Sequence, residues 1–447
     1  MTVPHSHNGE LANDAILARI AGVPDLATLE TGLFNKRVLV LGAGDLVAKK
    51  EAWVAFMKRL GVQVYLADVV EQPKALATLD KYIHDFVHMN GGSLADLGQF
   101  DLLDVSTWGY THLPMALRFW DRAEVIVTTK PVDTNLELLR AMRSSGLFKP
   151  LKDRLLVHDH YGGRWILREA ASRMPRWHGS EGFIRQVQIY ILERKSVNEE
   201  MDRLNALRDG VCLDLVPHAV KVIQTLLPIG ATWQHGKLRF VRRDLRLTVK
   251  GGAREHNVGC PIGGKVETFA AINLRGEDVV EIDGAEGRPF WFECLIVVGK
   301  GLVANDGDDK DTKGVSILFE TGNRLNIDLE TQRAHAPSGE LILPPTDVLH
   351  RGINLPLIEL TRAGFPKTAP PDVAALFQTF EQAVDAAELI DAARRLNWLG
   401  RAYRPRASVV NMINAIPRAW WCEGDWQLEA LPRIAIGDVP QETLVVL

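Results

Sequence analysis

The chain has 447 residues, a formal net charge of −4 and 46% hydrophobic residues, which are ordinary values for a water-soluble protein of two or three domains. The small net charge gives no reason to expect nucleic acid or an anionic membrane surface as a partner. No apolar run reaches the ~18 residues that a membrane span needs, and the first residues lack the pattern of a secretory signal.

The four cysteines are scattered along the chain and show no C-x-x-C spacing. This pattern predicts neither a disulfide framework nor a zinc site, and we expect no metal centre. Reduced thiols are typical of a cytoplasmic protein, which is the setting we predict. The cysteines are Cys212, Cys260, Cys294 and Cys422.

The predicted elements divide the chain into four segments. They are an N-terminal helical extension (1–33), a Rossmann dinucleotide-binding domain (34–165), an α+β substrate and oligomerisation domain (166–345), and C-terminal helices with a tail packed on the preceding domains (346–447). The predicted fold class is therefore α/β followed by α+β. The second domain is expected to hold a mixed, largely antiparallel sheet with helices on one face.

A glycine turn follows the first predicted strand. Residues 36–41 predict a buried parallel strand, and the turn leads into a helix predicted over 48–60 and closed by Gly61. Two glycines in such a turn allow backbone N–H groups to approach a pyrophosphate, although Val47 stands where the third glycine of the motif would be. An empty doubly wound fold is the alternative. The residues assigned to the cofactor are Gly42, Gly44, Asp45 and Leu46.

An acidic residue ends the next strand, predicted over 62–67. The carboxylate of Asp68 could accept hydrogen bonds from the adenosine ribose hydroxyls. We predict NAD as the cofactor because a carboxylate here would repel the 2′-phosphate of NADP. Lys74, a few residues later, keeps NADP as an alternative.

Two further strands are predicted over 100–107 and 124–129, with a helix over 113–121 between them. Ligands of such parallel sheets bind at the carboxyl ends of the strands. A solvated loop lysine is the alternative for the lysine that follows the second strand, but its position favours an active-site role. The residues expected to face the nicotinamide are Thr107, Trp108 and Lys130.

The run Val157–Arg164 places two imidazoles, a carboxylate, a phenol and a guanidinium within a few residues, together with two glycines. Such a cluster suits a small polar substrate, anionic or polyhydroxylated, beside a nicotinamide. A helix-capping turn with solvated side chains is the alternative.

A candidate general base lies farther along the chain. Asp214 and His218 are four residues apart, a spacing that puts both on one face of a helix. Histidine titrates near neutrality, so it suits removal of a hydroxyl proton during hydride transfer. The alternative is that Pro217 and His218 begin a helix with the imidazole on its surface, while Asp214 is a capping residue.

Long alternating strands are predicted from Phe183 onward, and they indicate the second domain's sheet. They cover 183–192, 266–274, 289–298 and 315–320. Residues 373–396 have the periodicity of a single amphipathic helix. The tail carries Trp420, Trp421 and Trp426, from which we expect it to dock on the preceding domains.

Several of these motifs carry a family resemblance. The strand with G-A-G, the run D-L-L-D-V-S-T-W-G-Y-T-H and the run T-T-K-P resemble the N-terminal domain of the glucose–fructose oxidoreductase/inositol dehydrogenase family. The turn Gly42–Lys50 and the block Asp159–Arg164 also resemble the G-x-x-G-D-L-A-x-x-K and D-H-Y-L-G-K signatures of glucose-6-phosphate dehydrogenases. Weaker matches continue to about residue 330. The chain departs from these patterns at Thr129, Gly162 and Arg164.

The resemblance implies an NAD(P)-dependent oxidoreductase that acts on a sugar, sugar phosphate or cyclitol. It implies that His218 is the general base, that Asp159 orients it, and that Lys130 holds the reacting hydroxyl. Implied substrate contacts are His160, Tyr161, Arg164 and, less directly, Asp214. It also implies a homo-oligomer formed through the open sheet face. A redox-neutral enzyme with tightly bound NAD and a non-catalytic nucleotide sensor are the alternatives.

Overall fold

The computed structural model divides the chain into two compact units, which are described here separately. The first comprises Met1–Gly163 and Leu349–Glu381, and the second comprises Arg164–Val348 and Gln382–Leu447. The predicted extension up to residue 31 and the three tail tryptophans lie outside the described residues. No helix in the described part of the chain is long and apolar enough to cross a membrane. The described residues are 32–89, 97–193, 210–227, 232–235, 238–241, 246–249, 253–256, 266–282, 285–300, 311–345, 352–398 and 443–446.

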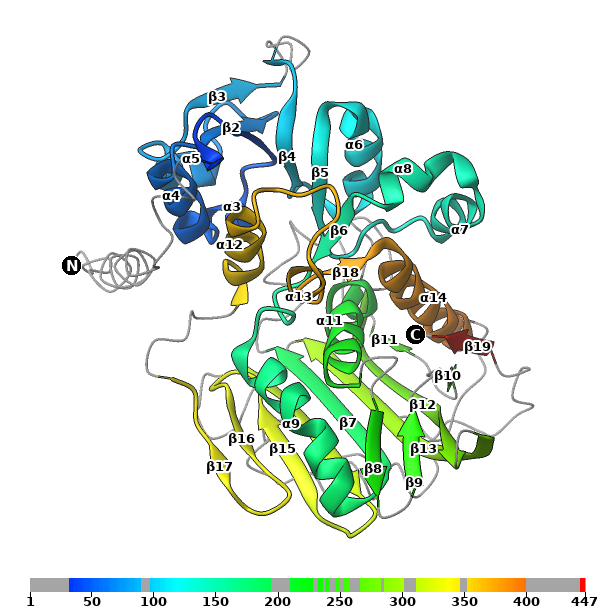
Figure 1. Cartoon of the computed structure of the whole chain (residues 1–447). Helices are drawn as coiled ribbons and strands as arrows, with labels where there is room; N and C mark the ends of the chain where they lie inside the picture. Colours follow the sequence, from blue (N-terminus) through cyan, green and yellow to red (C-terminus); the bar gives the residue numbers. More distant parts are fainter. Residues whose placement is uncertain are drawn as a thin grey trace, which may run out of the picture. The chain divides into compact units, whose positions relative to one another are not determined.

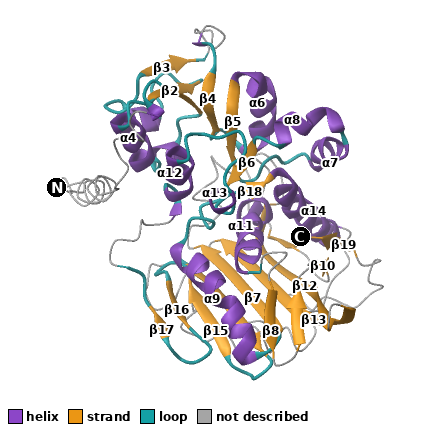
Figure 2. Ribbon diagram, in the orientation of Figure 1, coloured by secondary structure: helices purple, strands orange, loops and turns teal. Residues whose placement is uncertain are grey.

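The first unit is built on a seven-stranded sheet with the order β18-β6-β5-β4-β1-β2-β3 (Figures 1 and 2). Six strands are parallel, and β18 joins the edge antiparallel to β6. Short runs rich in valine, leucine and isoleucine form the central strands because both of their faces are buried. The strands are β1 (Arg37–Leu41), β2 (Gln63–Asp68), β3 (Asp85–His88), β4 (Phe100–Val105), β5 (Ala123–Thr129), β6 (Leu155–His158) and β18 (Gln378–Thr379).

Helices cover this sheet (Figure 1). They are α3 (Asp45–Ala48), α4 (Glu51–Arg59), α5 (Lys74–Leu79), α6 (His112–Phe119), α7 (Leu136–Ser144), α8 (Lys149–Lys152), α12 (Leu355–Arg362) and α13 (Pro371–Ala374). A short 3₁₀ turn, Gly109–Thr111, precedes α6. The alternation of parallel strands and helices confirms the predicted Rossmann architecture.

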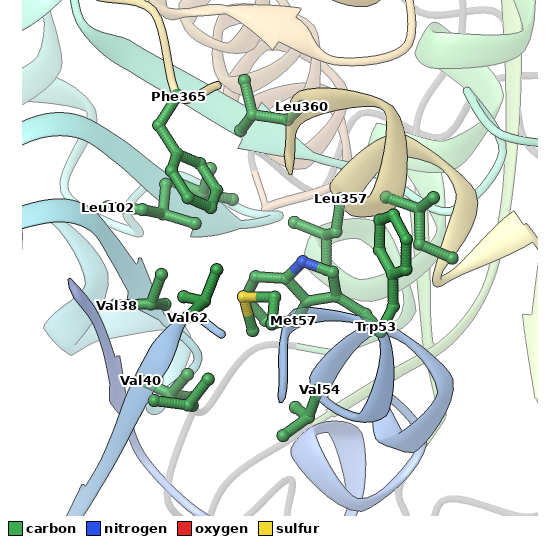
Figure 3. Close-up of a cluster of buried hydrophobic side chains, with 14 of the residues drawn as sticks. Val38, Val40, Trp53, Val54, Met57, Val62, Leu102, Leu357, Leu360 and Phe365 are labelled. Atoms are coloured by element: carbon green, nitrogen blue, oxygen red, sulfur yellow. The ribbon is translucent and has the colours of Figure 1, made fainter. Parts of the chain in front are cut away.

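One hydrophobic core joins β1 and β4 to helices that lie far apart in the sequence (Figure 3). Trp53 and Met57 of α4 pack with Leu357 and Leu360 of α12, which the chain supplies about 300 residues later. The Trp53 indole N–H also donates a hydrogen bond to the Thr361 hydroxyl at 2.9 Å. The segment 349–381 is therefore part of the first unit's core.

The helix predicted over 48–60 is divided in two. It starts earlier, as α3, and stops at Lys49 and Lys50 before α4 begins at Glu51. Lys50 is fully buried, and its ammonium donates to the Asp104 carboxylate and the Ser106 hydroxyl. The break between α3 and α4 lies at this lysine, whose side chain points into the protein interior. Helical periodicity in the sequence does not reveal that contact.

The second unit is built on a large sheet with the order β17-β16-β15-β14-β7-β13-β12-β10-β19. All its pairings are antiparallel except that of β7 with β13, which confirms the predicted mixed, largely antiparallel sheet. Figure 1 shows α9 (Trp165–Glu181) and α11 (Gly210–Leu226) on one face of it. The strands are β7 (Ile184–Glu193), β8 (Thr232–His235), β9 (Leu238–Val241), β10 (Arg246–Val249), β11 (Ala253–His256), β12 (Val266–Ile282), β13 (Ala285–Lys300), β14 (Thr312–Phe319), β15 (Arg324–Asp328), β16 (Arg333–His335), β17 (Leu341–Ile342) and β19 (Thr443–Val446).

Two helix predictions need correction. Pro217 does not begin a helix, because α11 already includes Gly210 and carries the proline inside it. The periodicity over 373–396 hides a break, since α13 ends at Ala374 and α14 (Phe380–Trp398) starts only after strand β18. A two-residue edge strand is too short to leave an alternating pattern in the sequence.

Candidate functional site

The first glycine of the turn after β1 is required by the fold itself. Gly42 has φ +87°, a left-handed conformation that residues with a side chain rarely adopt. A Cβ on Gly42 would lie 2.7 Å from the carbonyl oxygen of Ser106 at the end of β4. Both the backbone conformation and the packing therefore explain why glycine occupies position 42.

The second glycine has no such explanation. Gly44 has φ −79° and ψ −165°, an extended conformation that is open to any residue. A Cβ on Gly44 would meet no atom within 4 Å among the residues that the structure describes. Position 44 thus presents bare backbone to open space at the carboxyl edge of the sheet, where Rossmann proteins bind pyrophosphate.

The acid after β2 is joined to this turn. The Asp68 carboxylate accepts hydrogen bonds from the backbone N–H of Ala43 at 2.6 Å and from that of Val70 at 2.9 Å. Lys74 is the residue for which NADP was kept as an alternative cofactor. Its ammonium lies 2.6 Å from a carboxylate oxygen of Asp45. Because its charge is already paired, Lys74 is a weaker candidate for holding a 2′-phosphate.

A buried polar cluster that the sequence analysis did not find lies beneath the turn. The Lys50 ammonium is 2.6 Å from the Asp104 carboxylate and 2.7 Å from the Ser106 hydroxyl. That hydroxyl is 3.3 Å from the hydroxyl of Thr129 at the end of β5. Lys50 stands between Lys49 and Glu51 in the sequence, a charged run that does not distinguish a buried lysine from a surface one.

The residues expected to face a nicotinamide lie at the ends of β4 and β5. The Thr111 hydroxyl donates to that of Thr107 at 2.7 Å, and the next residue, Trp108, is 43% exposed. The backbone N–H of Lys130 donates to the His158 carbonyl at 3.1 Å, and the Lys130–Pro131 peptide bond is cis. The structure therefore brings Lys130 beside the end of β6, where the D-H-Y block begins.

The D-H-Y block forms a tight, buried turn. Asp159 accepts a hydrogen bond from the backbone N–H of Tyr161 at 2.9 Å, and both side chains are almost fully buried. His160 is half-buried, with its ring centroid 4.5 Å from that of Tyr161. A Cβ on Gly163 would collide with the carbonyl of Gly352. The alternative interpretation, a helix-capping turn with solvated side chains, is right about the turn. It is wrong about the side chains of Asp159 and Tyr161, which are buried.

Arg164 belongs to the second unit and is bound there. Its guanidinium donates to the carbonyl of Leu329 and lies 3.6 Å from the Glu330 carboxylate. The side chain is buried, and the residue forms the N-cap of α9. These contacts favour a structural role over the predicted contact with a substrate anion.

The predicted base and its neighbouring acid lie on α11 of the second unit. His218 is only 4% exposed, so the alternative of a surface imidazole is wrong. The Asp214 carboxylate is 2.6 Å from the ammonium of Lys300, which is buried and also lies 3.4 Å from Glu193. Lys300 was not among the predicted site residues.

Comparisons with solved structures place this fold among known oxidoreductases. A myo-inositol dehydrogenase from Corynebacterium glutamicum has a TM-score of 0.56 and 14% identity, with 82% of this chain and 98% of that chain covered. Levoglucosan dehydrogenase, in complex with NADH and levoglucosan, has a TM-score of 0.55 and 12% identity, covering 81% and 96%. An oxidoreductase from Agrobacterium radiobacter, in complex with NAD⁺, L-tartaric acid and magnesium, has a TM-score of 0.56 and 14% identity, covering 82% and 97%.

These likenesses confirm the predicted fold, a Rossmann unit combined with a largely antiparallel sheet unit. No protein-family model and no curated protein matches the sequence. The specific resemblance to glucose-6-phosphate dehydrogenase motifs therefore stays a prediction.

Proposed function

We propose that this protein is an NAD-dependent oxidoreductase acting on a hydroxyl group of a small carbohydrate-like substrate, a sugar, sugar phosphate or cyclitol. The observation that carries the proposal is Gly44, a glycine that neither backbone conformation nor packing requires. A ligand that approaches the backbone closely explains it, and a pyrophosphate is the ligand that this turn accepts in Rossmann folds.

The residues around the turn fit a dinucleotide. Gly42, Gly44 and Leu46 would contact the pyrophosphate, while Asp68 would face the adenosine ribose, and Thr107 with Trp108 would lie beside the nicotinamide. Bound NAD⁺ supplies a hydride acceptor for the carbon that carries the hydroxyl group. NAD is favoured over NADP because Asp68 is a carboxylate and Lys74 is paired with Asp45.

His218 is our candidate for the general base. Its imidazole would take the hydroxyl proton, and a buried position keeps water from competing for it. Lys130 would donate a hydrogen bond to the same hydroxyl oxygen, with Asp159 stabilising the charge on the base. Lys300 holds Asp214 by an ion pair, which makes Asp214 a fixed contact for a substrate hydroxyl.

The proposed substrate class rests on the chemistry of the predicted substrate contacts. His160, Tyr161 and Asp214 suit hydroxyl groups, whereas Arg164, the predicted anion contact, is bound to Leu329 and Glu330. This favours an uncharged sugar or cyclitol over a sugar phosphate. Two similar structures hold small hydroxylated molecules, levoglucosan in one and L-tartaric acid in the other.

We also propose a homo-oligomer that forms through the open face of the large sheet. Trp291 on β13 of that sheet is 42% exposed, and this aromatic side chain is the observation that we offer for the interface. The proposed cytoplasmic setting rests on the cysteine pattern, to which the structure adds that Cys212 and Cys294 are buried.

The test combines cofactor binding with a substrate panel. NADH and NADPH are titrated by fluorescence, and sugars, sugar 6-phosphates and inositols are assayed for reduction of NAD⁺ or NADP⁺. We expect His218→Ala to lower kcat by about 10²- to 10⁴-fold with little change in NADH affinity. His178→Ala is the matched control, because His178 is also buried in the second unit and its Nδ1 lies 3.1 Å from the carbonyl oxygen of Gly182.

An unchanged rate in His218→Ala would overturn the assignment of the base. NAD that stays bound through purification, with turnover but no net reduction, would indicate redox-neutral chemistry. Dinucleotide binding without turnover on any substrate would favour a nucleotide sensor.

A further inference from the structure

His112 bridges two backbone carbonyl groups at the carboxyl edge of the first unit's sheet. Its Nδ1 lies 2.7 Å from the carbonyl oxygen of Pro131, and its Nε2 lies 3.0 Å from that of Thr107. Thr107 follows β4 and Pro131 follows β5, which are neighbouring strands (Figure 1). The imidazole therefore spans the ends of two strands, and one of those ends carries Lys130.

The ring is held inside the protein. His112 is 2% exposed, and this burial lowers the pKa of its imidazole, an effect opposed by the two carbonyl groups and by Asp104 and reinforced by Lys50. Both ring nitrogens face carbonyl oxygens, which only accept hydrogen bonds, so a ring nitrogen that bonds its carbonyl does so through its own N–H.

Further contacts hold the loop after β4 and join it to the Lys130–Pro131 segment. The Thr111 hydroxyl bonds the Thr107 side chain and lies 2.7 Å from the carbonyl of Trp108. A Cβ on Gly109 would lie 3.3 Å from the ring of Pro131, so the loop after β4 runs against the Lys130–Pro131 segment. The His112 side chain, at the start of α6 directly after this loop, reaches the segment with a hydrogen-bonding group.

We propose that His112 is a positioning residue, which fixes the backbone of the Lys130–Pro131 segment against the loop after β4 through its Nδ1 bond to Pro131. The proposal rests on the proposed function in one respect, namely that Lys130 contacts the substrate. The Nδ1 bond is the one assigned because it is the shorter of the two and because it reaches the segment that carries the lysine.

Three substitutions of His112 distinguish the role of its Nδ1 from that of its Nε2. His112→Asn keeps a donor at the position of Nδ1, His112→Gln keeps one near the position of Nε2, and His112→Leu removes both. The three proteins are compared with wild type by hydrogen–deuterium exchange of the peptides covering 107–112 and 129–134, by NADH titration, and by kcat and KM on the best substrate of the panel.

We expect His112→Leu to speed amide exchange over 129–134 and to lower kcat by about tenfold or more, since small misplacements of a reacting group carry penalties of that order. NADH affinity should change little. His112→Asn should restore slow exchange and most of the rate, whereas His112→Gln should restore neither. Equal behaviour of the Asn and Gln variants, or normal exchange in the Leu variant, would overturn the proposal.

The exchange measurement needs no turnover. If wild type binds no dinucleotide and oxidises no substrate, the proposed function fails, while the exchange pattern of the three variants still decides whether His112 holds the segment. If His112→Leu fails to fold, the comparison of the Asn and Gln variants decides alone.

Discussion

The two glycines of the first turn are separated by one residue and have different roles. Gly42 is required by its positive φ and by the nearby Ser106 carbonyl, while Gly44 faces open space in a conformation that suits any residue. From the sequence both glycines could be assigned to a dinucleotide motif, since the motif includes both. Only the structure distinguishes Gly42, which shapes the turn, from Gly44, which leaves room for a ligand.

A pair of alanine substitutions tests this distinction. We expect Gly44→Ala to unfold like wild type but to bind NADH about tenfold or more weakly, a loss of ~1.4 kcal/mol, because the new methyl group occupies the space above the turn. Gly42→Ala should instead lower the free energy of unfolding by at least about 1–2 kcal/mol, because alanine is strained at positive φ. Urea unfolding and NADH titration of both proteins measure the two effects. Weakened stability in Gly44→Ala, or normal NADH binding, would contradict the assignment.

Elements with a strong repeating pattern could be predicted from the sequence, and elements decided by one tertiary contact could not. Strands β1, β2, β4 and β5 and the long strands β7, β12, β13 and β14 follow the predicted hydrophobic runs, whereas β3 and β6 were not predicted. The break at Lys50 depends on a partner 54 positions away, Asp104, and strand β18 exists only because it pairs with β6. His218 was found by its spacing from Asp214, whereas Lys300 becomes visible only through the ion pair.

The break between α3 and α4 gives a prediction about the buried pair beneath it. Lys50 and Asp104 have no exposed side-chain surface. Lys50→Met should lower the free energy of unfolding by about 3–5 kcal/mol, because it leaves the Asp104 carboxylate buried without its cation. The double variant Lys50→Met/Asp104→Leu should recover most of that loss, since no lone charge remains. Urea unfolding measures both, and a double variant no more stable than the single one would show that the helix break, rather than charge pairing, is what Lys50 supports.

Two separate segments of the chain form the first unit. The local sequence pattern could not predict this division. The predicted dinucleotide domain ends at residue 165, and 346–447 is predicted as one terminal segment. The structure returns Leu349–Glu381 to the first unit, where Leu357 and Leu360 complete the core over α4 and β1. Apolar periodicity shows that a helix has a buried face, but it does not show which of two cores that face completes.

This division predicts how the protein unfolds when NADH is present. Leu360→Ala should destabilise the first unit by about 2–5 kcal/mol, because it opens a cavity in a fully buried core position. NADH at about 100 times its Kd should add roughly 2.7 kcal/mol to whichever unit binds it. We therefore expect calorimetry to show that NADH raises the same transition that Leu360→Ala lowers. Leu325→Ala is the matched control, since Leu325 is equally buried in β15 of the second unit, and it should lower a transition that NADH leaves in place. If Leu325→Ala instead lowers the NADH-sensitive transition and Leu360→Ala does not, the residues after 349 do not belong with the dinucleotide-binding core.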